Sequence, residues 1–170
     1  MKEIHIYTDG AAKGNPGKGG YGIVMTLFGT TYQKEFYDGF RLTTNNRMEL
    51  LAVIIALKNI KDSSVPIKIF SDSKYVVDSI NLNWIANWKK RKFLNVKNPD
   101  LWKELIEMLP NYDLTFIWVK GHNGNPLNEK ADELAVKGSE IKDLKIDTFY
   151  EQNESNTSLG NVQLKFFSCS

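Results

Sequence analysis

The sequence is poor in cysteine: among 170 residues only Cys169 is one, and it lies next to the C-terminus. A single cysteine excludes a disulfide framework and a zinc site built from cysteines. Low cysteine use fits a reducing compartment, so we expect a cytoplasmic protein.

Long apolar runs are missing too. The N-terminal stretch MKEIHIYTDG has no apolar segment of signal-peptide length, and no run is long enough to span a bilayer. The chain also lacks an excess of one charge, because 22 basic and 20 acidic residues give a formal net charge of only +2. Any basic surface for nucleic acid must therefore be local. We expect no membrane association, no protein partner and a monomer.

The first forty residues predict three strands. Residues 2–9 alternate in the manner of a strand, and a glycine-rich loop is expected over 10–20. β-Branched and aromatic residues predict further strands over 21–28 and 31–40. Short links between these strands indicate an antiparallel meander.

Helical spacing begins near residue 45, and helices then alternate with short strands. The expected elements are a helix over 45–60, a strand over 67–70, a helix from 71–73, a helix from Pro99, a strand over 114–119, and a helix from Asn125 to Gly138. This order predicts an α/β fold with a mixed five-stranded sheet, three antiparallel strands followed by parallel ones, and helices on both faces. We expect one catalytic domain over 1–150 and a flexible or loosely docked tail over 151–170.

Acidic residues fall where these elements begin or end: Asp9, Glu49, Asp72 and Asp132. Each has an ordinary explanation as well. Asp9 suits a turn, Glu49 could complete a capping box with Asn46, Asp72 could cap a helix, and Asp132 could be a solvated helical residue.

The order of the elements gives these acids a joint explanation. Asp9 and Asp72 end parallel neighbouring strands, so their side chains should lie together at one edge of the sheet. Converging carboxylates repel one another unless a cation compensates. An oxygen-only cluster suits Mg²⁺ or Mn²⁺, and a pair of such ions is typical of phosphoryl chemistry.

Five segments, in this order and spacing, resemble the type 1 ribonuclease H family in its bacterial form. They are Tyr7-Thr8-Asp9-Gly10-Ala11 with Gly14-Asn15-Pro16-Gly17, Thr43-Thr44-Asn45-Asn46-Arg47-Met48-Glu49-Leu50, Ser71-Asp72-Ser73-Lys74-Tyr75-Val76, Val119-Lys120-Gly121-His122, and Asn128-Glu129-Lys130-Ala131-Asp132-Glu133-Leu134-Ala135. The resemblance covers roughly residues 1–150.

The resemblance implies an endonuclease that hydrolyses the RNA strand of an RNA/DNA hybrid with two Mg²⁺ ions, leaving 5′-phosphate and 3′-hydroxyl ends. It implies that Asp9 bridges both ions, that Glu49 and Asp72 hold one with it, and that Asp132 holds the other. His122 matches the mobile histidine of the family, and its near-neutral titration suits proton transfer or product release. Its structural alternative is a solvated loop histidine.

Further positions match substrate-binding residues of the family. Asn15, Asn45 and Ser73 match positions that face the RNA strand, where amides and hydroxyls can recognise a 2′-hydroxyl. Thr44 and Asn87 match its phosphate pocket for the DNA strand.

A basic run with interleaved tryptophans extends from Trp84 to Lys97. Such a run is often only a solvated face, but aromatic residues within it favour a nucleic-acid surface. It matches the basic protrusion of the family, with Trp84 expected against deoxyribose and Lys89, Lys90 and Arg91 against phosphates. Between Arg91 and Asp100 the protrusion is shorter than in the long bacterial members of the family and carries fewer basic residues, so we expect weaker and more salt-sensitive binding of the hybrid. No separate hybrid-binding domain is visible, so the catalytic domain is expected to bind alone.

Two other functions fit parts of this pattern. A non-catalytic hybrid-binding module predicts a broken acid set, whereas all four acids and His122 are present. A transposase or integrase shares the sheet and an acid triad, but the segment from Thr44 to Glu49 and the His122 loop disfavour it.

Overall fold

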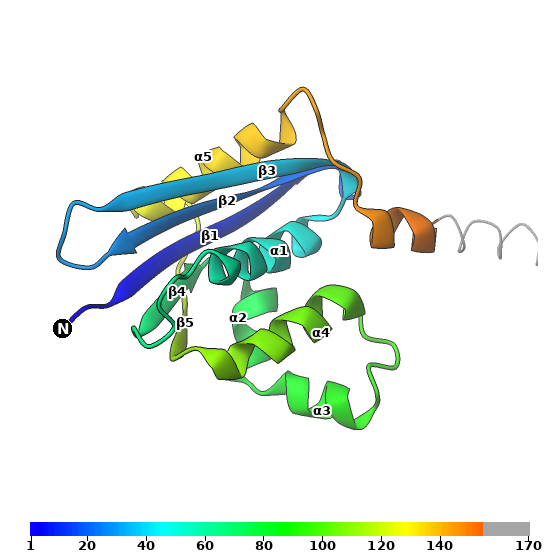
Figure 1. Ribbon diagram of the computed structural model, residues 1–170. Coiled ribbons are helices and arrows are strands. Elements are labelled where there is room, and N and C mark those ends of the chain that lie inside the picture. Colours follow the sequence, from blue (N-terminus) through cyan, green and yellow to red (C-terminus); the bar gives the residue numbers. More distant parts are fainter. Residues whose placement is uncertain (155–170) are drawn as a thin grey trace, which may run out of the picture.

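The computed structural model describes residues 1–154. Five strands form one mixed sheet in the order β3-β2-β1-β4-β5 (Figure 1). They are β1 (Ile4–Lys13), β2 (Gly17–Leu27), β3 (Gln33–Thr43), β4 (Ile67–Ser71) and β5 (Leu114–Trp118). β1 to β3 are antiparallel, whereas β4 is parallel to β1 and β5 is parallel to β4. The predicted fold class is confirmed.

Helices cover both faces of this sheet (Figure 1). One face carries α1 (Asn45–Lys58), α2 (Lys74–Asn81), α3 (Trp84–Lys90) and α4 (Pro99–Met108), and a short 3₁₀ helix, η1 (Leu109–Asn111), leads to β5. The other face carries α5 (Pro126–Ser139). No helix among residues 1–154 is long and apolar enough to cross a membrane.

The larger hydrophobic core lies between the sheet and α1, α2 and α4. Its largest fully buried side chain is Trp102 of α4, which packs edge-on against Trp88 of α3 with ring centroids 5.0 Å apart. A smaller cluster beneath α5 contains Tyr7, Val24, Ala131 and Leu134. The sheet is therefore fixed from both sides, as its apolar strands require.

The predicted glycine-rich loop over 10–20 is wrong in extent. Antiparallel pairing of β1 with β2 continues as far as Lys13 and Lys18, so the chain turns only around residues 14–16. Gly14 lies in this turn, whereas Gly10 and Gly20 lie within strands, where α1 and α5 approach the backbone closely. Glycine is typical both of loops and of strands that pack closely against another backbone, so the sequence pattern alone does not distinguish the two.

The capping roles that offered an alternative explanation for Glu49 and Asp72 are not the ones in the structure. Thr44, not Asn46, caps α1, because its side chain accepts a hydrogen bond from the Arg47 backbone N–H. Ser73, not Asp72, caps α2 by accepting from the Val76 N–H. Glu49 and Asp72 are thus left without the capping roles that would have explained them. At α5 the predicted cap is confirmed, since Asn125 accepts from the backbone N–H groups of residues 127 and 128.

The chain after α5 returns to the sheet. The Lys145 N–H donates to the Gly39 carbonyl, and residues 148–154 are helical. The tail expected over 151–170 thus begins inside this helical segment, and its residues 155–170 lie outside the described part of the chain.

Candidate active site

Asp9, Glu49 and Asp72 each offer a carboxylate oxygen to one cluster, in which these oxygens lie within 4.8 Å of one another. Asp9 lies on β1 and Asp72 directly follows β4. These strands are parallel neighbours, with Thr8 paired to Ser71, so the two acids lie side by side. The expectation that Asp9 ends its strand is wrong, because β1 continues past it to Lys13 and pairs there with β2. The convergence expected from strand order is therefore present in the structure.

Glu49 reaches this cluster because α1 touches β1 backbone to backbone. A Cβ atom on Gly10 would lie 2.7 Å from the Met48 carbonyl carbon, a separation that real Cβ atoms do not adopt. Glycine at this position lets the first turns of α1 lie against the strand, which brings Glu49 beside Asp9. Glu49 is 4% exposed.

Asp132 is brought in from the opposite face by a similar contact. Gly22 of β2 pairs with Asp9, and a Cβ atom there would lie 2.1 Å from the Ala131 carbonyl oxygen. The close approach of α5 places the residue after Ala131 next to Asp9. Asp132 lines the same hollow as the other three acids, and this hollow has a volume of about 430 Å³.

The loop between β5 and α5 carries His122 to the same hollow. A Cβ atom on Gly121 would lie 2.8 Å from Asp72 Oδ2, so the loop approaches Asp72 closely. The Trp118 indole N–H donates to the Asp72 carbonyl at 3.1 Å and holds the backbone there. His122 is solvent-exposed and adopts a left-handed conformation with φ of 53°.

Burial and mutual repulsion make this cluster hard to ionise. Burial, followed by the charge of Asp72, raises the pKa of Asp9 from 3.8 to about 8. Burial and the charge of Asp9 raise the pKa of Glu49 well above its ordinary value, and burial also raises the pKa of Asp72. A bound cation would reverse these shifts by favouring the carboxylate forms.

The donor set fits a hard divalent ion. Every converging side chain of the acid cluster offers oxygen, the ligand atom that Mg²⁺ and Mn²⁺ prefer. Among the described residues, Glu49 Oε2 is one of the buried side-chain atoms without a hydrogen-bond partner. A buried acceptor in this state is costly, and an ion held between Asp9 and Glu49 would satisfy it.

Several predicted substrate residues lie at or next to this hollow. Asn45 and Ser73 line it together with the acids. Asn15 lies one step away, where its Oδ1 accepts the Asn45 backbone N–H at 3.0 Å. Asn15 and Thr44 line an adjoining hollow of about 540 Å³. Asn46 lines both hollows, so they lie next to each other.

The other predicted substrate residues lie apart from these hollows. They belong to α3 and its C-terminal cap, and they are Trp84, Asn87, Lys89, Lys90 and Arg91. All five side chains are exposed, and none lines either hollow. α3 is therefore a basic helix that faces solvent. Thr44 and Asn87, which were expected to share a phosphate pocket, do not line the same hollow.

Two residues of the adjoining hollow were missed from the sequence. Asn98 lines it together with Thr44, and Arg47 forms a buried part of its wall. The sequence pattern predicts only that a helix starts at Pro99, and it assigns no role to Asn98. Its position directly after the basic run was the available signal.

Comparison with known proteins agrees with this geometry. A family model described as RNase H matches residues 1–140. The chain belongs to the ribonuclease H family. Members of this family are metal-dependent hydrolases that degrade RNA in RNA/DNA hybrids. The resemblance inferred from the sequence segments is confirmed.

Similar proteins cover nearly the whole chain. Ribonuclease HI of Shewanella oneidensis is 49% identical over 158 residues, which covers 89% of this chain and 96% of the relative. Ribonuclease H of Syntrophus aciditrophicus is 46% identical over 155 residues, covering 88% of each.

Solved structures share the fold. LC9-RNase H1, a type 1 RNase H with the type 2 active-site motif, is 27% identical with a TM-score of 0.72, covering 82% of this chain and 72% of that one. LC11-RNase H1, solved in complex with an RNA/DNA hybrid, is 27% identical with a TM-score of 0.59, covering 79% and 94%.

Proposed function

We propose that this ribonuclease H cuts internally in the RNA strand of an RNA/DNA hybrid by a two-metal-ion mechanism, leaving 5′-phosphate and 3′-hydroxyl ends. The observation that carries the proposal is the cluster of Asp9, Glu49 and Asp72 within 4.8 Å, with Asp132 and His122 lining the same hollow. Mg²⁺ is the proposed ion, with Mn²⁺ as a substitute of similar ligand preference.

Within this site the carboxylates divide the work. Asp9 would contact both ions, Glu49 and Asp72 would hold one with it, and Asp132 would hold the other. When bound, the ions would lower the pKa of a water molecule and neutralise charge on the leaving oxygen. The rigid backbone contact of Gly10 with α1 keeps Asp9 and Glu49 in place without a change of conformation.

His122 would transfer a proton to the leaving oxygen. Its exposed position on a loop beside Asp72 lets the imidazole reach the leaving oxygen and then return to solvent. A near-neutral imidazole can both accept and release a proton at physiological pH.

Recognition of the hybrid would be shared between two surfaces. The amides of Asn15 and Asn45 and the hydroxyl of Ser73 lie along the hollows, where they suit a 2′-hydroxyl. Thr44 at the N-terminus of α1 suits a phosphate of the DNA strand. Trp84, Lys89, Lys90 and Arg91 on the exposed α3 would neutralise and pack against the backbone further along. A monomer acting in the cytoplasm is the proposed setting.

A gel assay tests the proposal directly. End-labelled RNA/DNA hybrid, single-stranded RNA and duplex DNA are incubated with the protein, in Mg²⁺ and in chelator. We expect metal-dependent cleavage of the hybrid RNA only, with fragments that a polymerase can extend and that carry a 5′-phosphate. Cleavage of duplex DNA would favour a transposase-like nuclease, and hybrid binding without cleavage would favour a non-catalytic module.

A further inference from the structure

Arg47 is a buried cation that joins three parts of the chain. It lies in α1 and is 2% exposed. Its Nε and Nη2 donate to Asp147 at 2.7 and 3.0 Å, and its Nη1 and Nη2 donate to Asp100 at 2.9 and 2.7 Å. Nη1 also donates to Asn98 Oδ1 at 3.4 Å. The guanidinium thus uses all of its N–H donors, and α1 is joined to the start of α4 and to the segment after α5.

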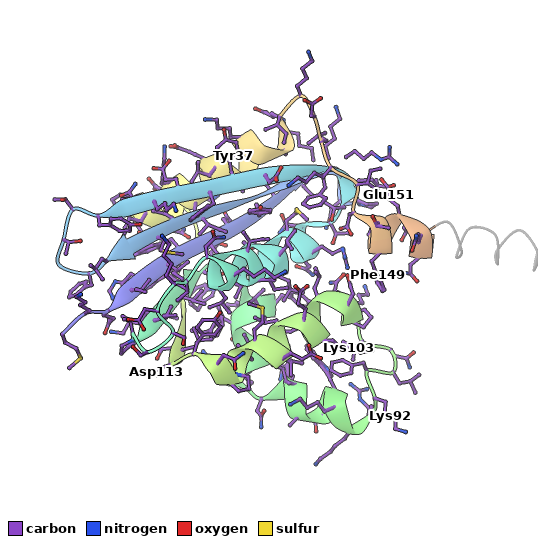
Figure 2. The ribbon with its side chains drawn as sticks, in the orientation of Figure 1. Tyr37, Lys92, Lys103, Asp113, Phe149 and Glu151 are labelled. Atoms are coloured by element: carbon purple, nitrogen blue, oxygen red, sulfur yellow. The ribbon has the colours of Figure 1, made fainter. Side chains whose placement is uncertain are left out.

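Asp147 extends this connection to β3. The Thr43 hydroxyl donates to Asp147 Oδ2 at 2.7 Å, next to the Arg47 contact. The rings of Phe149 and Tyr150 lie 5.4 and 5.9 Å from the guanidinium carbon and cover it. Figure 2 shows Phe149 and Glu151 on this segment, beside the start of α1. The Asp147 carboxylate therefore bonds to Thr43 at the end of β3 and to Arg47 at the start of α1, and we call these contacts the clamp.

The groups on either side of the clamp are those that line the hollows. Thr44 and Asn45 follow Thr43 directly, and Asn98 lies opposite them. The Asn98 Nδ2 donates to the Tyr75 hydroxyl at 3.1 Å, and Tyr75 lines the hollow of the carboxylates. A continuous set of hydrogen bonds thus leads from Asp147, through Arg47 and Asn98, to the wall of the active site.

We propose that Asp147 and Arg47 are positioning residues for hybrid binding, because Asp147 holds the start of α1, with its substrate-binding groups, in place. The inference rests on the proposed function. Without Asp147, a buried guanidinium would lack two of its acceptors, and the start of α1 would move to find others. Asp9 lies in β1, Asp72 directly follows β4, and Glu49, further along α1 than Arg47, is held by the backbone contact with Gly10, so the metal ligands stay in place. Loss of the clamp therefore weakens binding of the hybrid and leaves the chemical step intact.

The test is Asp147→Asn, which keeps the shape and removes the charge, compared with Glu151→Gln in the same segment. Glu151 pairs with Arg41, whose side chain is 56% exposed, so this control removes a surface ion pair. We expect KM for the hybrid to rise roughly tenfold in Asp147→Asn with kcat within about twofold, since small displacements of binding groups have large effects. Glu151→Gln should leave both parameters unchanged.

Hydrogen exchange supplies a readout that does not depend on activity. The Asn45 and Arg47 backbone N–H groups, which donate to Asn15 Oδ1 and Thr44 Oγ1, should exchange faster in Asp147→Asn and not in the control. A lowered melting temperature with unchanged KM and unchanged exchange at these amides would overturn the proposal and show a purely structural ion pair.

Two provisions keep the outcomes separate. If Asp147→Asn does not fold, Thr43→Val removes only the hydroxyl contact to Asp147 and should shift KM in the same direction by a smaller factor. If the wild-type protein fails to cleave hybrid, the proposed function fails. The exchange of the two amides then still decides whether Asp147 positions α1.

Discussion

The backbone nitrogen of Glu49 lies where a side chain on residue 10 would be: a Cβ atom on Gly10 would come within 2.5 Å of it. Two acids from distant parts of the sequence are thus held together by backbone packing. This backbone contact holds Asp9 and Glu49 together whether or not either carboxyl group is ionised. The geometry of the metal site thus depends on Gly10, which has no side chain to bind a metal ion.

Gly10→Ala should therefore be severely damaging. The added methyl group must push α1 away from β1, because the atoms that it meets are backbone atoms and the Met48 Cβ. We expect a loss of roughly 1–3 kcal/mol in the free energy of unfolding and a much larger proportional loss of kcat. Urea unfolding and hybrid cleavage measure the two effects.

A matched control is Gly29→Asn. Gly29 has a positive φ of 77° and no atom within 4 Å of the added Cβ, and asparagine tolerates this conformation. Stability and activity should both stay near wild type. A fully active Gly10→Ala would show that α1 can move without disturbing Glu49.

Sequence reasoning succeeded where the order and direction of the strands bring the functional residues together. Asp9, Asp72 and Glu49 lie beside each other because strand order and a helical crossover dictate it, and those can be read from periodicity. It failed where an interaction spans the chain. Arg47 and Asp147 are separated by 100 residues, and no local pattern connects them. Likewise, the caps at Thr44 and Ser73 depend on backbone details that neighbouring polar residues mimic.

The pH dependence of stability should report the acid cluster in metal-free protein. The pKa of Asp9 is raised from 3.8 to about 8, so between these values the folded state binds more protons than the unfolded state. Stability should therefore fall as pH rises through this range and level off above it. Thermal melts in chelator measure this slope.

Asp9→Asn should flatten that slope and raise the melting temperature at the alkaline end, because a repelling charge is removed. It should also abolish cleavage while hybrid binding largely survives, since the contact surface remains. Asp143→Asn, at an exposed carboxylate after α5, is the control and should change neither the slope nor the cleavage rate.

Adding Mg²⁺ to the wild type should stabilise it most at high pH, where protons no longer neutralise the cluster. Undiminished turnover in Asp9→Asn would contradict the metal assignment.

His122→Asn should lower kcat by about 10²-fold with a smaller effect on KM, because general acid–base groups contribute about that much. Asparagine is chosen because it tolerates the left-handed conformation at this position, with φ of 53°. Steady-state cleavage of the hybrid measures both parameters. Asn123→Ala, a change to the neighbouring exposed residue, should leave kcat near wild type. Equal losses in both variants would indicate that the loop, and not the imidazole, is what matters.

The last prediction concerns the basic C-terminal end of α3 and the salt dependence of hybrid binding. Lys89, Lys90 and Arg91 are exposed on a helix whose position is fixed by Trp88 against Trp102, so their charges project from a rigid support. Changing all three to glutamine should weaken binding to every hybrid sequence alike and reduce the slope of log Kd against log salt by up to about three. Lys2, Lys34 and Lys61, which are also exposed, provide a control triple of equal charge away from both hollows. Fluorescence anisotropy in chelator, over a range of salt concentrations, measures both. If the two triples lower the slope equally, the effect is one of net charge and α3 is not the interface. If only the α3 triple does so, the hybrid must extend from the carboxylates to α3.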